Sequence, residues 1–405
     1  MATESGTIKR VEWLEVIPAL RLAKAAWIAL TPSILALAFL GYLVSSIGWQ
    51  AASLILTREE RFQLTLTTEF ELDDYVPAWN TFTLDGPVEY VIRHTAGRVA
   101  MLGRIDLSWR GVLYFMIGNL WAIGVWSLVG GTICRYSVLK LGAEESPDIF
   151  ACARMVFARW LSFFTAPLYP LLGVALLTLP LAIAGLLMRA DLGVLIMGLL
   201  WVVVLLVSAV IAWLLVGLFF GWILMWPAIS AEQEGDTFDA FSRSYSYVFG
   251  KPVHYAFYLV VAGLVGWFAL ELVEYVAAVE TRAGFWGTSW GAGRQRTLEI
   301  QALVGDYQRS FQLDGAPPKL NSSEHIGAWL ISWSIAIVRA VPRSFAYAFF
   351  FVAASGIYLL LRKDVDDKEL DDLYHEDDAA RFAAGRRAVS VGVPSASSDV
   401  NNEGE

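Results

Sequence analysis

Charged residues are scarce in this sequence of 405 residues. Asp, Glu, Lys and Arg together make up 17% of the chain, against about 25% in an ordinary soluble domain. The net charge is −9, so no basic surface for nucleic acid is predicted. With 57% apolar residues and a mean hydropathy of +0.53, the composition is typical of a membrane protein.

Cysteine and histidine are also rare. The two cysteines, Cys134 and Cys152, are too few for a disulfide framework and are expected to be free thiols. The four histidines lie far apart without a metal-binding spacing, and no phosphate-binding loop or nucleophile motif occurs. The sequence therefore identifies no catalytic residue, no metal site and no cofactor.

Long apolar blocks are what the sequence has instead, and many of its 17 tryptophans stand at their edges. A block of about 20 apolar residues is long enough to cross the hydrocarbon core of a bilayer. Tryptophan prefers the membrane–water interface. We predict an all-α polytopic transmembrane bundle with interfacial amphipathic helices and about six spans, at residues 27–47, 111–133, 161–188, 192–226, 254–276 and 344–361.

Proline and glycine predict irregularities inside these spans. Pro167 and Pro180 in the third span indicate kinks or breaks, because proline removes a helical hydrogen bond. The fourth span would reach about 52 Å as one helix, which exceeds the hydrocarbon thickness. It must tilt, protrude or break, and Gly198 or the Gly217/Gly221 pair are the expected places.

The segments between the spans differ in length and charge. We predict that residues 1–26 are a cytoplasmic amphipathic segment. Residues 49–109 and 280–343 are predicted to be extracytoplasmic segments. The first of these two contains a predicted strand near 62–66, and the second a predicted short helix near 296–311. Residues 325–343 are either an interfacial helix or part of a longer, broken span. Residues 362–405 begin with the Arg362-Lys363 membrane-edge anchor and form an acidic, then disordered, cytoplasmic tail. Basic residues near span ends favour cytoplasmic termini in the cell (inner) membrane.

Two segments that join successive spans resemble each other. The first reads GAEESPDIFACARMVFARW (142–160) and the second SAEQEGDTFDAFSRSYSYVFGK (230–251). Both run Ala-Glu, a short acidic step and Asp-x-Phe, and each aspartate stands where a helix N-cap is expected. We predict two cytoplasmic connectors that serve as interaction sites, through Asp148, Phe150 and Arg154 in the first and Glu232, Asp236, Phe238 and Arg243 in the second.

The second connector carries a family resemblance. The segment from Trp226 to Tyr258 resembles a connector in a broad set of uncharacterised bacterial multi-span inner-membrane proteins. That set includes the membrane domains attached to some glycerophosphodiester phosphodiesterases. In it a proline ends one span, and an acidic residue then precedes an Ala-x-x-x-Ser helix; the counterparts here are Pro227, Glu232 and residues 240–244. The phosphodiesterase barrel itself has no counterpart, so the resemblance implies a membrane scaffold.

Few polar side chains lie within the predicted spans. Asn119 is the strongly polar residue of the second span, and Glu271 and Glu274 lie near the outer end of the fifth. A carboxylate at membrane depth points to function, although a position this close to the span end also suits an interfacial role.

Three functions agree with these features. The leading one is a non-enzymatic scaffold or accessory component that acts through lipids, a protein partner or a second copy of itself. A permease or channel is the alternative, with a path lined by Asn119, Ser127, Thr178 or Ser208. The third is a lipid-modifying enzyme with Glu271, Glu274 or Asp148 as acid or base.

Overall fold

The computed structural model describes residues 18–61, 86–104, 107–233, 235–313 and 322–373. Within these ranges the chain is helical and forms no strand. The predicted all-α polytopic fold is therefore confirmed. The predicted strand near 62–66 lies outside the described residues.

Six of the helices are long and apolar enough to cross a membrane, as the sequence predicted. They are α3 (Pro32–Ser53), α6 (Trp109–Gly142), α9 (Leu168–Leu187), α11 (Trp201–Ala231), α13 (Pro252–Ala292) and α15, whose apolar part is Ile326–Asp366. Shorter helices join or flank them, namely η1 (Pro18–Leu20), α2 (Arg21–Ala29), α5 (Pro87–Ala100), η2 (Met101–Gly103), α7 (Ile149–Ala158), α8 (Trp160–Thr165), α10 (Asp191–Leu199), α12 (Thr237–Gly250) and α14 (Arg294–Leu313).

The second half of α15 (Ser322–Asp366) is the centre of the molecule. Residues 345–361 are buried, and α15 packs against α2, α3, α5, α6, α11 and α13. The aromatic side chains of Phe349, Phe350 and Phe351 fill this centre, and Trp222 of α11 stacks on Phe350 at 5.2 Å. A span that is apolar all round suits a place inside a bundle, away from lipid.

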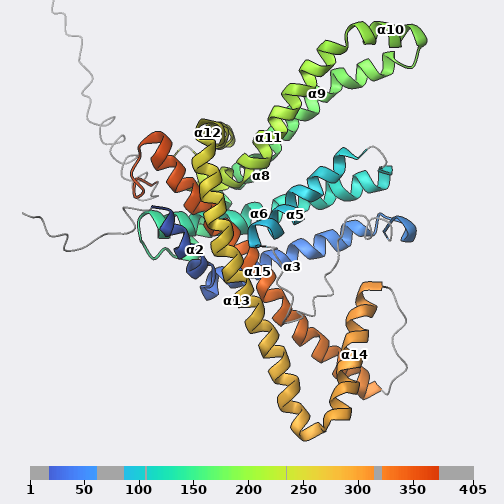
Figure 1. Ribbon diagram of the computed structural model, residues 1–405, viewed down its shortest axis with the longest axis vertical. Helices are drawn as coiled ribbons and strands as arrows, with labels where there is room; N and C mark the ends of the chain where they lie inside the picture. The colour runs from blue at the N-terminus through green and yellow to red at the C-terminus, as the bar shows by residue number, and fades with distance from the viewer. Residues whose placement is uncertain (1–17, 62–85, 105–106, 234, 314–321, 374–405) are drawn as a thin grey trace, which may run out of the picture.

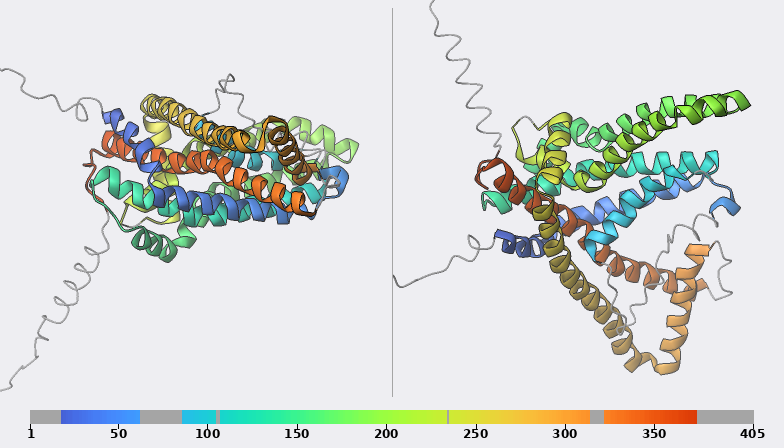
Figure 2. Two further views of the ribbon diagram at one scale, coloured as in Figure 1. Left: turned by 90° about the horizontal axis from the view of Figure 1, so that it is seen from below. Right: turned by 45° about the horizontal axis from the view of Figure 1, so that its top comes forward.

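From this centre three arms diverge, as Figure 1 and the right view of Figure 2 show. One arm is the hairpin α9–α10–α11, the second holds α3, α5 and α6, and the third holds α13, α14 and the first half of α15. The opposite end, which we call the polar end, carries α2, α7, α12 and the last turns of α15. Both ends of the described chain, Pro18 and Leu373, therefore lie on one side of the molecule.

The helices break close to proline and glycine residues. Pro32 begins α3, so Trp27 belongs to the preceding helix α2. Pro167 separates α8 from α9, while Pro180 stays inside α9. The long fourth block breaks at Leu200, two residues after Gly198, and α11 then runs unbroken through the Gly217/Gly221 pair. At Gly217 the missing side chain makes room for the ring of Tyr245.

The segments between spans are more helical than expected. Helix α13 continues to Ala292 and α15 is one continuous helix with Pro342 inside it, so residues 325–343 form no separate helix. The predicted helix near 296–311 is α14. Between α3 and α6, α5 packs back against α15 and α13. Helix α2 also packs on α15, with Leu22 buried against Gly356, because its apolar face meets protein.

Candidate functional site

The end of α11 is held by arginine side chains at the polar end. Arg135 of α6 is 4% exposed and donates from Nη1 to the Ser230 carbonyl at 2.7 Å. Arg159, in the turn after α7, donates to the carbonyls of Glu232 and Gln233 at 3.2 and 3.0 Å. The last carbonyls of a helix lack partners within it and carry partial negative charge. Two guanidinium groups therefore cap α11 and fix the position of the residue that follows it.

That residue, Glu232, is a buried carboxylate. It is 6% exposed, and its Oε1 lies 2.8 Å from Nε of Arg362, which is 2% exposed. The hydroxyl of Tyr358, one turn before Arg362 on α15, donates to the same oxygen at 3.0 Å. A buried carboxylate keeps its charge when cations and hydrogen-bond donors surround it.

Two further cations face Glu232. Lys368 Nζ lies 3.3 Å from Oε2, and Nη1 of Arg243 on α12 lies 3.7 Å from Oε1. Burial raises the pKa of Glu232, but attraction to Arg362, Arg243 and Lys368 outweighs burial and holds this pKa below its ordinary value. We call these residues the ion cluster, namely Glu232, Arg243, Tyr358, Arg362 and Lys368.

The last turn of α15 and the chain that follows it pack onto the polar end. Asp366 accepts a hydrogen bond from the Tyr247 hydroxyl of α12, and Asp364 accepts one from Tyr258 of α13 at 2.8 Å. At Gly142, the last residue of α6, a Cβ would lie 2.5 Å from the Leu370 carbonyl oxygen. Residues 362–373 are thus part of the packed structure, and Arg362 is buried where a membrane-edge anchor was expected.

The seven predicted connector residues separate into two groups. Asp148 caps α7 by accepting from Ala151 N at 3.2 Å, and Asp236 caps α12 by accepting from Asp239 N at 2.7 Å. These capping roles follow the expectation from sequence. Arg154 is exposed, as are Phe150 and Phe238 at 79% and 61%. The structure thus brings Glu232 and Arg243 together in the ion cluster and leaves the other connector residues at the surface.

The predicted intramembrane polar residues lie on two helices. Asn119 of α6 is 8% exposed and donates to the Arg98 carbonyl at 3.3 Å, and the Arg98 guanidinium lies 4.3 Å from the centre of the Trp49 ring. Asn119 therefore fixes the end of α5 against α6. Glu271 and Glu274 are half-buried on α13.

Sequence reasoning missed four of the residues that build this end of the molecule: Arg135, Tyr358, Arg362 and Lys368. The sequence indicated a buried ion pair for two of them, because Arg135 and Arg362 each lie at the end of an apolar block. A charged side chain that does not reach water at such a position needs a partner. Their partners come from other helices, which local patterns do not reveal.

The arrangement favours a structural role for Glu232. Its carboxylate oxygens face three cations and a tyrosine hydroxyl, so a proton would have to displace strong partners. Such a cluster fixes the end of α11, the middle of α12 and the end of α15 relative to one another. Comparisons of the chain with protein-family models, with curated proteins and with solved structures each returned no match.

Proposed function

We propose that this chain is a non-enzymatic scaffold or accessory subunit of the cell (inner) membrane, with both termini in the cytoplasm. It acts by holding the spans of a second membrane protein on the hairpin α9–α10–α11. Two features support this role. The polar end is fixed by buried ion pairs, and the hairpin projects from it with little internal packing.

The hairpin carries the argument. In the most apolar stretches of α9 and α11, 6% of the residues are buried, against 28% in α3, α6 and α13 and 100% in α15. Around Gly185 of α9 and Gly198 of α10, nothing lies within 4 Å of the place that a Cβ would take. Small residues on an open apolar surface allow another helix to approach closely, which is how spans associate in lipid.

A permease receives less support from the residues that would line its path. Asn119 bonds to Arg98, and Ser127 is buried and accepts a hydrogen bond from Trp160 at 2.9 Å. Thr178 is exposed on α9 and bonds within its own helix, to Val174. A lipid-modifying enzyme receives less support too, because the carboxylate of Asp148 serves as a helix cap.

Site-specific cross-linking in native membranes tests the proposal. A photoreactive amino acid replaces Leu206 of α11, which is 63% exposed, and in a matched control it replaces Ile47 of α3, which is 62% exposed. After irradiation the tagged chain is purified and analysed by mass spectrometry for protein and lipid. We expect a stoichiometric protein adduct at Leu206 and its absence at Ile47. Lipid adducts alone at both positions would contradict the proposal, and transport assays in vesicles would follow.

A second comparison separates the hairpin from the connectors. Replacing Phe150 and Phe238 by alanine removes exposed aromatic rings without touching the helix caps or the ion cluster. Of the hairpin it alters the ring contact of Phe238 with Tyr169, at the start of α9. This pair suits the purpose better than Asp236→Ala or Arg243→Ala, which would also disturb packing. If the partner docks on the hairpin, its yield in the purification stays unchanged in the double variant.

A further inference from the structure

Helix α9 carries a regular apolar stripe on its surface. Positions that follow one another at alternating spacings of four and three residues are all leucine or isoleucine, namely Leu172, Leu176, Leu179, Ile183 and Leu186. Their exposed fractions lie between 57% and 59%, so the described chain leaves all five largely uncovered. Residues at this spacing lie on one face of a helix. At 1.5 Å per residue the stripe is about 21 Å long, which is most of the hydrocarbon thickness.

A different face of α9 meets the other helix of the hairpin. Gly173 lies against α11, because a Cβ there would be 3.5 Å from Cδ1 of Leu214. Ala175 and Ala182 are exposed and lie beside the stripe. Small residues next to large apolar ones let a second helix approach closely in lipid. The surface of α9 thus has the pattern of helix pairs that pack like coiled coils.

The tip of the hairpin carries one charge of each sign. Arg189 follows the end of α9, and Asp191 is the first residue of α10. Both are exposed, and neither side chain forms an ion pair within the described part of the chain. A tip with both signs, two residues apart, has the same charges to offer as it needs to meet.

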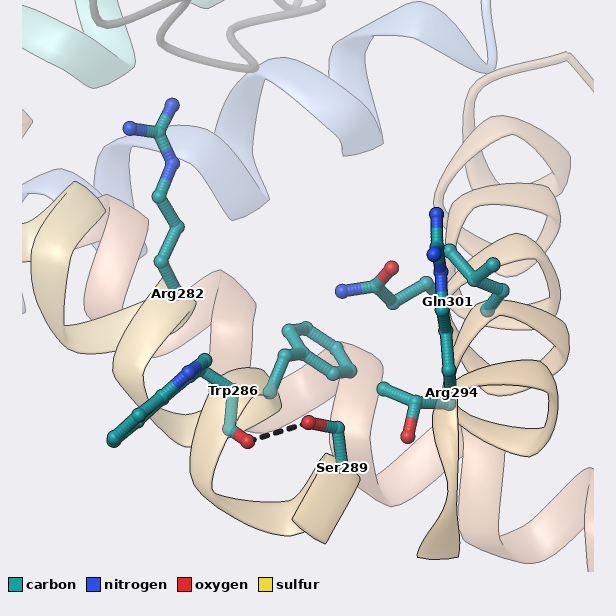
Figure 3. Close-up of a pocket in the computed structure, with 8 residues that line it drawn as sticks. Arg282, Trp286, Ser289, Arg294 and Gln301 are labelled. Carbon is teal, nitrogen blue, oxygen red and sulfur yellow. Dashed lines mark hydrogen bonds between the residues drawn. The ribbon is translucent and has the colours of Figure 1, made fainter.

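The tip of the third arm is different. Its Arg296 pairs within the arm, with Glu324 at 2.7 Å. A hollow of about 280 Å³ lies there between α13 and α14. Figure 3 shows that the Arg282 side chain points away from Arg294 and that Ser289 bonds to its own helix. The charged groups of this hollow do not converge, so the hairpin is the arm whose surface suggests an occupant.

Twofold symmetry fits both features of the hairpin. A symmetric dimer brings the same surface of two copies together, so each contact between two different residues occurs twice. Two copies inserted in the same direction are related by an axis along the membrane normal, and their hairpins run parallel. The stripe of one copy then meets the stripe of the other. At the tip, Arg189 of each copy meets Asp191 of the other.

We propose that this chain forms a symmetric dimer through the stripe on α9. The leucine and isoleucine side chains supply the packed contact, and the two tip ion pairs fix the register and the parallel orientation. Self-association through α9 does not rest on the scaffold role, because Leu206 and the rest of the α11 surface stay accessible to another protein.

Charge reversal at the tip tests the dimer. Two differently tagged forms of the full chain are co-expressed and purified through one tag in mild detergent, and the other tag is measured. Arg189→Asp in both forms, or Asp191→Arg in both, places like charges together and should lower recovery about tenfold. Arg189→Asp in one form with Asp191→Arg in the other should restore it. The matched control is Arg294→Asp, an exposed arginine at the tip of the third arm, which should leave recovery unchanged.

Cysteine cross-linking in native membranes locates the contact. In a parallel helix pair the stripe residues lie opposite their own copies, close enough for a disulfide. Leu179→Cys should therefore give a linked dimer on oxidation. The matched control is Leu264→Cys on α13, which is 63% exposed and should stay monomeric. The native Cys134 and Cys152 are 0% and 3% exposed, so they add little background.

Two results would overturn the proposal. One is equal recovery in every combination of tagged forms, the two charge reversals included. The other is a Leu179→Cys protein that yields no more linked dimer than Leu264→Cys. A missing partner adduct at Leu206 would change neither readout, so self-association and the scaffold role fail separately.

Discussion

The two connectors share a sequence pattern and a local structure but differ in how deeply they are built into the molecule. In both, an aspartate caps a short helix and a phenylalanine two residues later is exposed. The glutamates differ. The side chain of Glu144 is 67% exposed and pairs with Lys24 at 3.0 Å, whereas the side chain of Glu232 is 8% exposed among three cations. Local sequence thus determines the helix cap in each connector. The burial of the glutamate is determined by segments distant in sequence, which cover Glu232 but not Glu144.

The largest effect is expected from removing the charge of Glu232. Glu232→Gln removes the carboxylate nearest to the buried Arg362 and leaves the more distant one of Asp372 at 3.7 Å. Removing one partner of a buried ion pair typically costs about 3–5 kcal/mol. The free energy of unfolding, measured by denaturant titration in detergent with tryptophan fluorescence, should fall by this order. A variant as stable as the wild type would show that the ion cluster does not hold the polar end together.

The same carboxylate predicts a loss of stability in acid. The pKa of Glu232 is lower in the folded state than in the unfolded state. The contribution of this carboxylate to the free energy of unfolding is therefore complete at a pH above its unfolded-state pKa, and it is lost as the pH falls through its folded-state pKa. The unfolding free energy of the wild type should fall below about pH 5, and the fall should be smaller in Glu232→Gln. Parallel pH profiles for the two proteins would contradict this assignment.

The helix caps should show what the two connectors have in common. Asp148→Ala and Asp236→Ala each remove one hydrogen bond to the first turn of a helix and should each cost about 1 kcal/mol. The same unfolding assay measures both variants. A much larger loss for Asp236→Ala would mean that the α12 cap also supports the ion cluster, so that the local similarity of the connectors is incomplete.

The smallest effect is expected at Glu144. Its ion pair with Lys24 is open to solvent and should contribute less than about 1 kcal/mol. Glu144→Gln therefore serves as the matched control for Glu232→Gln, with the same chemical change at the equivalent connector position. If both variants lost similar stability, the difference in burial between the connectors would have no energetic consequence.

The sequence predicted those features that depend on near neighbours. Six apolar helices, the break at Pro167 and the break close to Gly198 follow from composition and from the geometry of proline and glycine. The caps at Asp148 and Asp236 follow from their place before a helix. In each of these cases the residues that produce the helix, the break or the cap lie within a few positions of it in the sequence.

Features that join distant segments were not predictable in the same way. Tyr358 and Glu232 are 126 residues apart, and no local pattern pairs them. From the sequence we expected a separate helix or a broken span over residues 325–343, whereas α15 runs unbroken through Pro342. Neighbouring helices can support a proline inside a span, and a local pattern does not reveal those neighbours. The burial of Arg362 depends on Glu232, which follows a different helix and lies 130 residues earlier in the chain.

The central place of α15 has a consequence for how the molecule is made. Translation proceeds from the N-terminus, so five spans leave the ribosome before the helix around which they pack. Until α15 enters the bilayer, Gly130 has no Phe351 ring to cover it and Glu232 has no Arg362 to pair with. Helix α15 therefore completes the packing of these six spans, and a ribosome that stops before residue 344 releases helices that have entered the membrane without the helix on which they pack.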